Sequence, residues 1–376
     1  MKYYIIAGEQ SGDLHGSNLI KELKKTDPDA RFRFWGGDMM QKEAGEPVRH
    51  MRNTAFMGFR EVLLNLPLIL NNIRLCKKDI ISYNPDALIL IDYPGFNLKM
   101  AKYATKKGIK VFYYISPKVW AWNISRVKKI KSYVPHMLTI FPFETEFYEK
   151  YGYKVDYVGN PLIDALEDYP FKDEDFSSFV SRNNLEKRPV VALLPGSRLR
   201  EIEKCLPVML ELIPQYPQYQ FVIACTGSVD KAFYERFVKG CNVKLLFDQT
   251  YALLKHSRAA IVVSGTATLE AALIGVPQVV CYKTGRLLYF LGKRLVKVPW
   301  ISLVNLIMKR EAVKELIQDQ LNVERLSQEF SRIVNEGESR RQMLNDYRRL
   351  AGMLGGVSPS RKAACKIYNY LNKGQG

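Results

Sequence analysis

The sequence predicts an α/β protein with two doubly wound, Rossmann-like domains that face each other across a cleft, followed by a helical C-terminal tail. Short apolar tracts alternate with amphipathic helical stretches along most of the chain. This pattern indicates a parallel sheet covered by helices on both faces. The alternation stops in a polar segment at residues 162–188 and then restarts. A length of 376 residues also suits two domains.

The first predicted domain comprises residues 1–165. Its strands are, in order, the tracts "YYIIAG", "RFRFWGG", "DALILID", "IKVFYYIS", "HMLTIFPF" and "YKVDYVGN". The second domain, residues 186–322, restarts the alternation with "PVVALLPGS", "YQFVIAC", "NVKLLF", "AAIVVSGT" and "VPQVVCY". Residues 323–376 are basic and show a helical pattern without strands, so we treat them as a separate C-terminal segment that packs back on the first domain or is exchanged between the subunits of a dimer.

Charge and cysteine content narrow the class of protein. There are 56 Lys and Arg against 38 Asp and Glu, a net charge of +18. This excess predicts an anionic partner: nucleic acid, an acidic membrane surface or a phosphorylated substrate. The sequence has no export signal and no apolar window that could span a bilayer, so we expect a cytoplasmic protein. Six cysteines without a CxxC pair indicate reduced thiols, and four scattered histidines predict no metal site.

The first loop that could carry chemistry is "AGEQSGD", which follows the first predicted strand. In open α/β sheets, ligands bind beyond the carboxyl ends of the strands. Gly8 and Gly12 permit close backbone approach. The simpler interpretation is a tight turn in which Ser11 or Asp13 caps the next helix. Glu9 favours a functional interpretation, because a carboxylate at this strand end can bind a sugar hydroxyl in the cleft.

The second such loop is "LILIDYPGFN", in which Asp92 ends an apolar strand. A lone buried carboxylate is costly, so Asp92 must be solvated by the cleft or paired. Two interpretations stay open from the residues alone. Asp92 either takes a proton from an attacking hydroxyl or caps the helix that starts near Pro94. The next loop, "YYISPKVWAWNISRVKKI", combines aromatic and basic residues; core packing explains part of it, and its cations, Lys118 among them, partly face solvent.

In the second domain, "LLPGSRLRE" follows the first strand of that domain. Gly196, Ser197 and Arg198 lead into a helix, whose N-terminal N–H groups attract anions. An arginine can also grip a phosphate with two hydrogen bonds. We therefore expect this loop to bind a diphosphate, although a simple turn with a surface arginine is the alternative.

A second small-residue loop in this domain follows another strand, in the stretch "AAIVVSGTATLEAAL". Ser264, Gly265 and Thr266 again offer backbone N–H groups to an anion. Glu270 lies about one turn into the next helix, where its carboxylate could accept both hydroxyls of a ribose. The two loops together predict a nucleoside diphosphate. Neither matches the P-loop pattern, so a P-loop ATPase is disfavoured.

Two further stretches mix apolar and basic residues: 62–72 ("VLLNLPLILNN", bordered by basic residues) and 285–303 ("GRLLYFLGKRLVKVPWISL"). The first is too short to span a bilayer, and each, taken alone, is best interpreted as core. Together with the charge of +18, they favour a protein that works at a membrane surface.

Nine stretches of the sequence occur in the order found in a known family. They are "AGEQSGDLHG", "GGDMM", "MGFREVL", "IDYPGFN", "YYISPKVWAW", "FPFETEFYEKYG", "LLPGSRLREIE", "SGTATLEAAL" and "KRLVKVPWISLVNLI". Over nearly its whole length the chain resembles the lipid-A-disaccharide synthase family. The "PKVWAW" motif and the "AGE-SGD" frame are far more distinctive than any single glycine loop.

This resemblance implies the GT-B fold and an inverting hexosyltransferase of lipid A biosynthesis. The implied donor is UDP-2,3-diacylglucosamine and the implied acceptor is 2,3-diacylglucosamine 1-phosphate. The products would be a β-1,6-linked disaccharide 1-phosphate and UDP, formed without a metal or other cofactor. The resemblance also implies a peripheral protein on the cytoplasmic face of the inner membrane, and a homodimer with exchanged C-terminal segments.

The resemblance also assigns roles to individual residues. It implies that Asp92 is the general base and that Glu9 and Ser11 lie near the reacting sugars. The implied ligands of the UDP-sugar are Gly196, Ser197, Arg198, Ser264, Gly265, Thr266, Glu270 and Asn305, the last in "SLVNLI". Many members of the family carry a second acid where this chain has Gly95, so Asp92 is the only acid in its motif.

The residues alone leave two alternative functions open. Another GT-B enzyme that handles UDP-N-acetylglucosamine, a peptidoglycan transferase or a 2-epimerase, would have a similar second domain. A nucleic-acid-binding protein would account for the charge, but the sequence has no recognisable nucleic-acid-binding module, and its distinctive residues lie in the predicted cleft loops. We therefore expect no nucleic-acid partner.

Overall fold

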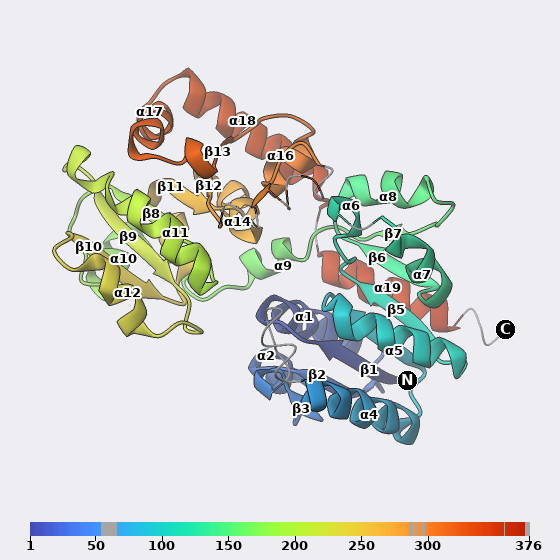
Figure 1. Ribbon diagram of the computed structural model, residues 1–376. Helices are drawn as coiled ribbons and strands as arrows, with labels where there is room; N and C mark the ends of the chain where they lie inside the picture. Colours follow the sequence, from blue (N-terminus) through green and yellow to red (C-terminus); the bar gives the residue numbers. More distant parts are fainter. Residues whose placement is uncertain are drawn as a thin grey trace. The chain divides into compact units, whose positions relative to one another are not determined.

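The computed structural model describes residues 1–53, 66–122, 124–285, 289, 290, 292, 294, 298–356 and 358–372. The chain divides into two compact units. The first unit is Met1–Ala165 with Leu354–Gly376, and the second is Leu166–Met353. Each contains one parallel sheet covered by helices, as Figure 1 shows. The prediction of an α/β protein with two doubly wound, Rossmann-like domains is confirmed; their arrangement about a cleft stays a prediction.

The sheet of the first unit has, among the described residues, the order β3-β2-β1-β4-β5-β6-β7, and all neighbouring strands are parallel. Its centre is a run of apolar, fully buried residues in β1 and β4. Because Ile91 pairs with both Ala7 and Tyr114, the carboxyl ends of β1, β4 and β5 lie level. The strands are β1 Lys2–Ala7, β2 Arg31–Gly36, β3 Arg49–His50, β4 Ala87–Ile91, β5 Lys110–Tyr114, β6 His136–Thr139 and β7 Asp156–Tyr157.

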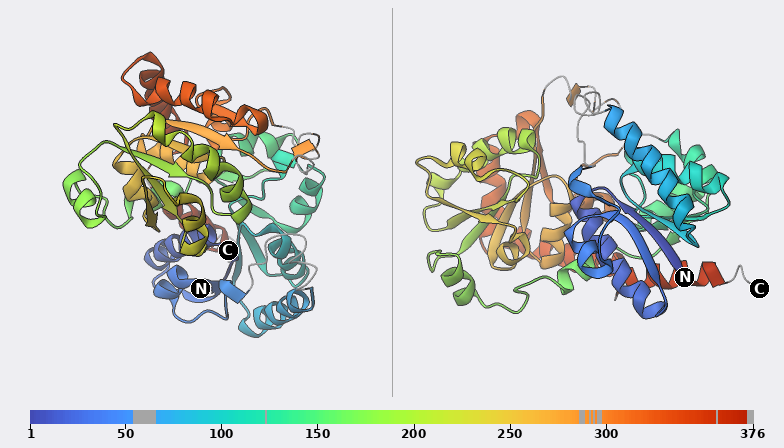
Figure 2. Two further views of the ribbon diagram at one scale, coloured as in Figure 1. Left: turned by 60° about the vertical axis from the view of Figure 1, so that its left-hand side comes forward. Right: turned by 90° about the horizontal axis from the view of Figure 1, so that it is seen from below.

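The helices of this unit cover both faces of the sheet (Figures 1 and 2). On one face α4, α5 and α7 pack as neighbours, and on the other α1 packs against α2 and α19. Alternate strand residues, such as Tyr4 and Ile6 or Leu88 and Leu90, form the core beneath α4, α5 and α7. The helices are α1 Gln10–Thr26, α2 Asp38–Ala44, the 3₁₀ turn η1 Met51–Asn53, α4 Leu66–Tyr83, α5 Pro94–Lys106, α6 Val119–Trp122, α7 Arg126–Tyr133, α8 Pro142–Glu149, α9 Leu162–Glu167 and α19 Pro359–Asn372.

The sheet of the second unit is also parallel, in the order β10-β9-β8-β11-β12-β13 among the described residues. The strands are β8 Val190–Leu194, β9 Gln220–Cys225, β10 Val243–Phe247, β11 Ser257–Val263, β12 Gln278–Tyr282 and β13 Lys314–Ile317. The helices are α10 Phe176–Arg182, α11 Leu199–Leu210, η2 Ile213–Gln215, α12 Lys231–Val238, α13 Thr250–Lys255, α14 Thr266–Ile274, α16 Leu303–Met308, η3 Gln318–Gln320, α17 Val323–Val334 and α18 Glu338–Met353.

Two strands were not predicted from the sequence, and both have a physical reason. β3 has two residues, too few to show a pattern. β13 reads "KELI", and its charged Glu315 is buried because the carboxylate accepts hydrogen bonds from the amides of Ile301 and Ser302 at 3.0 and 2.9 Å. A charge that is paired in this way can lie inside a sheet.

The C-terminal segment 323–376, which we treated as one piece, is divided between the units. α17 and α18 belong to the second unit, whereas α19 belongs to the first. Asp156 accepts hydrogen bonds from Lys366 at 2.6 Å and from Tyr370 at 2.9 Å. Asp164 accepts one from the Ser360 amide at 2.7 Å. These bonds attach α19 to strand β7 and helix α9; exchange of this segment within a dimer stays a prediction.

The two apolar and basic stretches lie partly outside the described residues. Of residues 62–72, the structure describes 66–72, the start of α4, and of 285–303 it describes 285, 289, 290, 292, 294 and 298–303. Among the helices described, none is long and apolar enough to cross a membrane.

Candidate active-site residues

Asp92 lies at the carboxyl end of β4 on a strained backbone. Asp92 and Tyr93 have φ angles of 43° and 48°, and Ile115, after the neighbouring β5, has a φ of 68°. The left-handed region is unusual for any of these and a genuine outlier for a β-branched residue. The Asp92 amide donates to the Tyr114 carbonyl at 3.2 Å, and the Tyr113 hydroxyl donates to the Asp92 carbonyl at 2.5 Å. Such strain, about 1–3 kcal/mol per residue, collects at functional sites.

Asn97, one turn into α5, holds this strand end in place. Its side chain is fully buried, and its Nδ2 donates to the carbonyls of Ile6, Ile91 and Asp92 at 3.4, 3.2 and 2.8 Å. One amide group therefore ties together the carboxyl ends of β1 and β4. Sequence reasoning missed this role, although the "IDYPGFN" motif contains Asn97.

The surroundings of Asp92 suit a general base. The pKa of Asp92 is raised to about 6, mainly by burial and also by the nearby Glu9 carboxylate, whereas the Lys118 ammonium acts in the opposite direction. A base with a pKa near the working pH is the most effective one. The capping interpretation of Asp92 is wrong, because the N-cap residue of α5 is Tyr93.

Glu9 occupies the N-cap position of α1 in extended backbone. It lies at the same edge of the sheet as Asp92, and Ser11 is exposed in the first turn of α1. Gly8, just before, permits the close approach of a ring: a Cβ there would lie 2.4 Å from two carbons of Tyr93. The glycine is therefore needed for the first loop to pack against the loop that carries Asp92.

Asp13 has a role other than the predicted one. Its carboxylate accepts hydrogen bonds from the amides of Gly37, Met39 and Met40 at 2.6, 2.9 and 3.1 Å. It thus caps α2, and in the described residues neither Ser11 nor Asp13 caps α1. A Cβ on Gly37 would lie 2.6 Å from this carboxylate, which explains the "GGDMM" motif as packing.

The aromatic stretch after β5 is mainly core, as the packing interpretation predicted. Trp120 is buried and lies edge-on to Phe141 and Phe143, with ring centroids 6.5 and 4.9 Å apart. Lys118, in contrast, is exposed. Of the residues described at this edge, Lys118 is the cation whose charge lowers the pKa of Asp92, a role that sequence reasoning did not assign.

In the second unit, the loop after β8 contains Gly196, Ser197 and Arg198, which were predicted to bind a diphosphate. Gly196 has a φ of 99°, and a Cβ there would lie 2.6 Å from Oε2 of Glu201. Ser197 and Arg198 are exposed. The Arg198 guanidinium, whose side chain is 68% exposed, contacts Glu201 at 3.3 Å. This cation is accessible to a ligand.

The loop after β11 lies beside it, because β8 and β11 pair in the sheet. Ser264 donates from its hydroxyl to the Ile301 carbonyl at 2.8 Å, whereas Gly265 and Thr266 are exposed at the start of α14. Glu270 accepts a hydrogen bond from the Tyr251 hydroxyl at 3.2 Å. Burial raises the pKa of Glu270 to about 7.

Asn305 is fully buried at the start of α16, and both atoms of its amide are bonded within the unit. Nδ2 donates to the Val313 carbonyl and to Glu315, both at 2.9 Å. Oδ1 accepts from the amides of Ala312 and Val313 at 2.7 and 2.9 Å. The side chain therefore shapes the backbone between α16 and β13.

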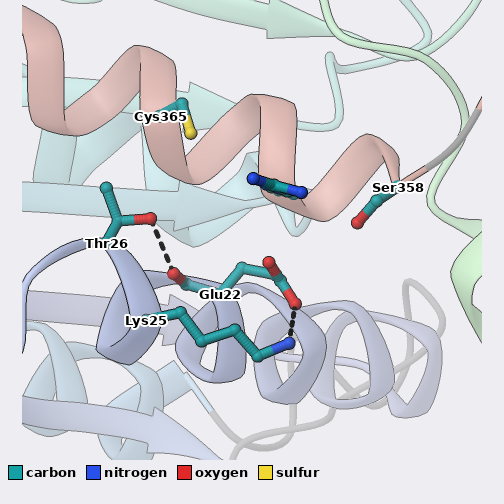
Figure 3. Close-up of a pocket in the computed structure, with 6 residues that line it drawn as sticks. Glu22, Lys25, Thr26, Ser358 and Cys365 are labelled. Carbon is teal, nitrogen blue, oxygen red and sulfur yellow. Dashed lines mark hydrogen bonds and ion pairs between the residues drawn. The ribbon is translucent and has the colours of Figure 1, made fainter.

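The first unit also has a cavity of about 560 Å³ between α1 and α19 (Figure 3). It is lined by Glu22, Lys25, Thr26, Ser358, Arg361 and Cys365. Within the described chain, none of the predicted site residues lines it, so the cavity is separate from the edge that carries Asp92.

Comparison with known proteins decides the family. The family model described as lipid-A-disaccharide synthetase matches residues 3–366 of this chain. The chain belongs to the lipid-A-disaccharide synthase family. It is 39% identical to the lipid-A-disaccharide synthase of Geobacter metallireducens, over 98% of this chain and 97% of that protein. It is 35% identical to the Coxiella burnetii enzyme, over 98% of each chain.

Solved structures show the same fold at low identity. UDP-GlcNAc 2-epimerase from Neisseria meningitidis, bound to UDP-GlcNAc, matches with a TM-score of 0.67 and 14% identity, over 99% of this chain and 100% of that chain. The calicheamicin glycosyltransferase matches with a TM-score of 0.58 and 15% identity, over 98% of each chain. These likenesses are to GT-B-like proteins and bear on the fold. The family membership confirms the prediction of a glycosyltransferase of lipid A biosynthesis.

Proposed function

We propose that this synthase-family chain transfers the sugar of UDP-2,3-diacylglucosamine to the 6-hydroxyl of 2,3-diacylglucosamine 1-phosphate with inversion of the anomeric carbon. The products are the β-1,6-linked disaccharide 1-phosphate and UDP. The observation that carries the proposal is Asp92: a carboxyl group with a pKa of about 6, held at a strand end by the strained loop and by Asn97.

In the proposed reaction Asp92 takes the proton of the acceptor 6-hydroxyl. The oxygen attacks the anomeric carbon of the donor from the side opposite UDP, and the bond between that carbon and the diphosphate oxygen breaks. Glu9 and Ser11 contact the sugars beside this base. Burial, together with the negative charge of Glu9, keeps the Asp92 carboxylate basic enough to accept the proton near neutral pH.

The second unit has the groups to hold the UDP. The exposed Arg198 and the amides of Gly196 and Ser197 bind the diphosphate and stabilise the charge that grows on it as it leaves. Gly265 and Thr266 offer a second set of N–H groups, whereas the Ser264 amide, contrary to the prediction from the sequence, donates to the Cys281 carbonyl at 2.9 Å. Glu270 accepts the hydroxyls of the ribose. Asn305 is a positioning residue that maintains the backbone between α16 and β13.

We also propose that the first unit works on the cytoplasmic face of the inner membrane. α4 exposes Leu66, Leu70, Leu75 and Ile81. In sequence, α4, α5 and α7 carry one acid, Asp79, against many cations. These cations are Arg74, Lys77, Lys78, Lys99, Lys102, Lys106, Arg126, Lys128, Lys129 and Lys131. Apolar side chains among cations suit an anionic lipid surface, where both acylated substrates reside.

One incubation tests the reaction. The protein is mixed with the acylated donor and acceptor, and the products are examined by mass spectrometry for the disaccharide 1-phosphate. A parallel incubation with unacylated UDP-N-acetylglucosamine serves as the comparison. Formation of the acylated disaccharide supports the proposal; turnover of the unacylated donor alone would instead favour a 2-epimerase or peptidoglycan transferase.

Vesicle sedimentation tests the membrane surface. Binding to vesicles that contain phosphatidylglycerol, weaker binding to neutral phosphatidylcholine and loss of binding in Lys128→Glu/Lys129→Glu would support it. Tight binding to oligonucleotides without binding to anionic vesicles would contradict it.

A further inference from the structure

Two buried hydrogen bonds connect the loop after β5 to α8. The Glu144 carboxylate accepts the Trp120 indole N–H at 3.1 Å, and the Ser116 and Tyr148 hydroxyls lie 2.6 Å apart. All four side chains are buried. The loop is thus held at two points, Ser116 and Trp120. Lys118 lies midway between them.

Glu144 also fixes its own end of the connection. Its other oxygen accepts hydrogen bonds from the amides of Ile140 and Phe141 at 3.1 and 3.0 Å. These amides follow β6, the strand next to β5. Capping of α8 by Glu144 requires only the hydrogen bonds from these amides. The additional bond from Trp120 joins the loop after β5 to the loop after β6.

We propose that Glu144 is a positioning residue of the active site: by bonding Trp120 and the amides after β6, it fixes the 115–122 loop and places the Lys118 ammonium beside Asp92. This role rests on the proposed function of Asp92 as the base. The strained Ile115 begins the same loop, so the loop needs tertiary bonds to stay in this conformation.

The charged groups around Asp92 support the proposal that Glu144 acts through Lys118. Asp92 faces the Glu9 carboxylate, the Lys118 ammonium and the phenol of Tyr113, and Glu9 in turn faces the phenol of Tyr93. Of these, Lys118 lowers the pKa of Asp92. Displacement of this cation must therefore raise the pKa of Asp92 and move the proton-accepting form to higher pH.

Glu144 has different neighbours from Asp92. It faces the phenols of Tyr148 and Tyr157, the Ser116 hydroxyl and the Trp120 indole. Burial raises the pKa of Glu144, whereas the amides of Phe141 and Ile140 and the Trp120 indole lower it because they donate hydrogen bonds to the ionised carboxylate.

The test measures the Asp92 titration directly, by ¹³C NMR of labelled aspartate carboxyls in the full chain, with Asp92→Asn to assign the signal. Lys118→Met should raise the midpoint, and Glu144→Gln should raise it in the same direction. Because the two act through one contact, Glu144→Gln should add no further shift in a Lys118→Met background.

Two further variants keep the test decisive. Trp120→Phe retains the ring but removes the N–H donor; it should also raise the midpoint and carries the test if Glu144→Gln does not fold. Asp27→Asn is the matched control: this buried carboxylate accepts the Tyr3 hydroxyl at 3.0 Å just beyond the other end of α1, so it should leave the midpoint unchanged.

An unchanged Asp92 midpoint in folded Glu144→Gln or Trp120→Phe would overturn the proposal, as would a full additional shift in the double variant. The NMR reading needs no substrate. If the unaltered chain forms no disaccharide, the proposed function fails while the positioning role is still decided. If the unaltered chain does form the disaccharide, the pH at which kcat/KM falls on the acid side should shift in each variant together with the NMR midpoint of Asp92.

Discussion

The strand ends of the two units differ in how they present their functional groups. Around Asp92 the backbone is strained, and the Asn97 amide and the Tyr113 hydroxyl bond it to neighbouring strands. Around Arg198 the loop is exposed, and among the described residues its guanidinium forms one ion pair, with Glu201 at 3.3 Å. A base must be held at a fixed position relative to one hydroxyl. A diphosphate, in contrast, can order flexible cationic and amide donors as it binds.

The largest expected effect comes from removing the base. Asp92→Asn should lower kcat by about 10²–10⁴-fold, because the neutral amide cannot accept the proton, while the affinity for UDP stays unchanged. Steady-state kinetics and calorimetric UDP binding measure the two quantities. Asp79→Asn, which alters a carboxylate bonded to Tyr4 and Arg33, is the control. Full turnover in Asp92→Asn would remove Asp92 from its role.

In the exposed loop after β8, a substitution should lower the affinity for UDP, the quantity that Asp92→Asn leaves unchanged. Arg198→Ala should weaken UDP binding by roughly 10–100-fold, because charge-assisted hydrogen bonds contribute about 1.5–3 kcal/mol, and it should leave the thermal midpoint unchanged. Arg200→Ala, which alters another exposed arginine, two residues further along in α11, should bind UDP like the unaltered chain. Equal losses in both variants would indicate a general charge effect.

A third prediction concerns the rigidity of the Asp92 edge. Asn97→Ala removes the donor from three backbone carbonyls, two of them in buried hydrogen bonds, and should destabilise the first unit by about 1–3 kcal/mol. Denaturant unfolding followed by a probe in that unit measures the loss. Asn71→Ala, at an exposed position of α4, should cost little. If both variants were equally stable, Asn97 would not hold the strand ends together.

The smallest effect concerns Glu270. Because burial raises the pKa of Glu270 from 4.5 to about 7, the stability it contributes is fully present below pH 4.5 and is lost as the pH rises through 7. Glu270→Gln is neutral throughout, so its thermal midpoint relative to the unaltered chain should rise by roughly a few degrees between pH 5 and pH 8. A pH-independent difference would contradict this.

Local sequence patterns were sufficient for the strands and loops that carry Asp92, Glu9 and Arg198, because apolar tracts and glycine turns are local signals. The partners of these residues were not predictable in this way. Asn97, Glu144 and Tyr113 act through hydrogen bonds to residues far away in sequence: Ile6 in β1, Trp120 in α6 and Asp92 after β4.

The same limit explains the errors. Asp13 was interpreted as a cap for its own helix, but its acceptor oxygens serve α2, 24 or more residues away. β13 was missed because its buried Glu315 is satisfied by amides that only the fold brings near. A residue type indicates which bonds it can form; tertiary structure decides which partners it meets.

The most direct test of the account is the pH dependence of kcat/KM for disaccharide formation between pH 5 and pH 8. If the partly buried Asp92 carboxyl at the end of β4 is the proton acceptor, the rate should reach a plateau near neutrality and fall about tenfold per pH unit below a midpoint near 6. A rate that stays constant down to pH 5 would show that a different group accepts the proton.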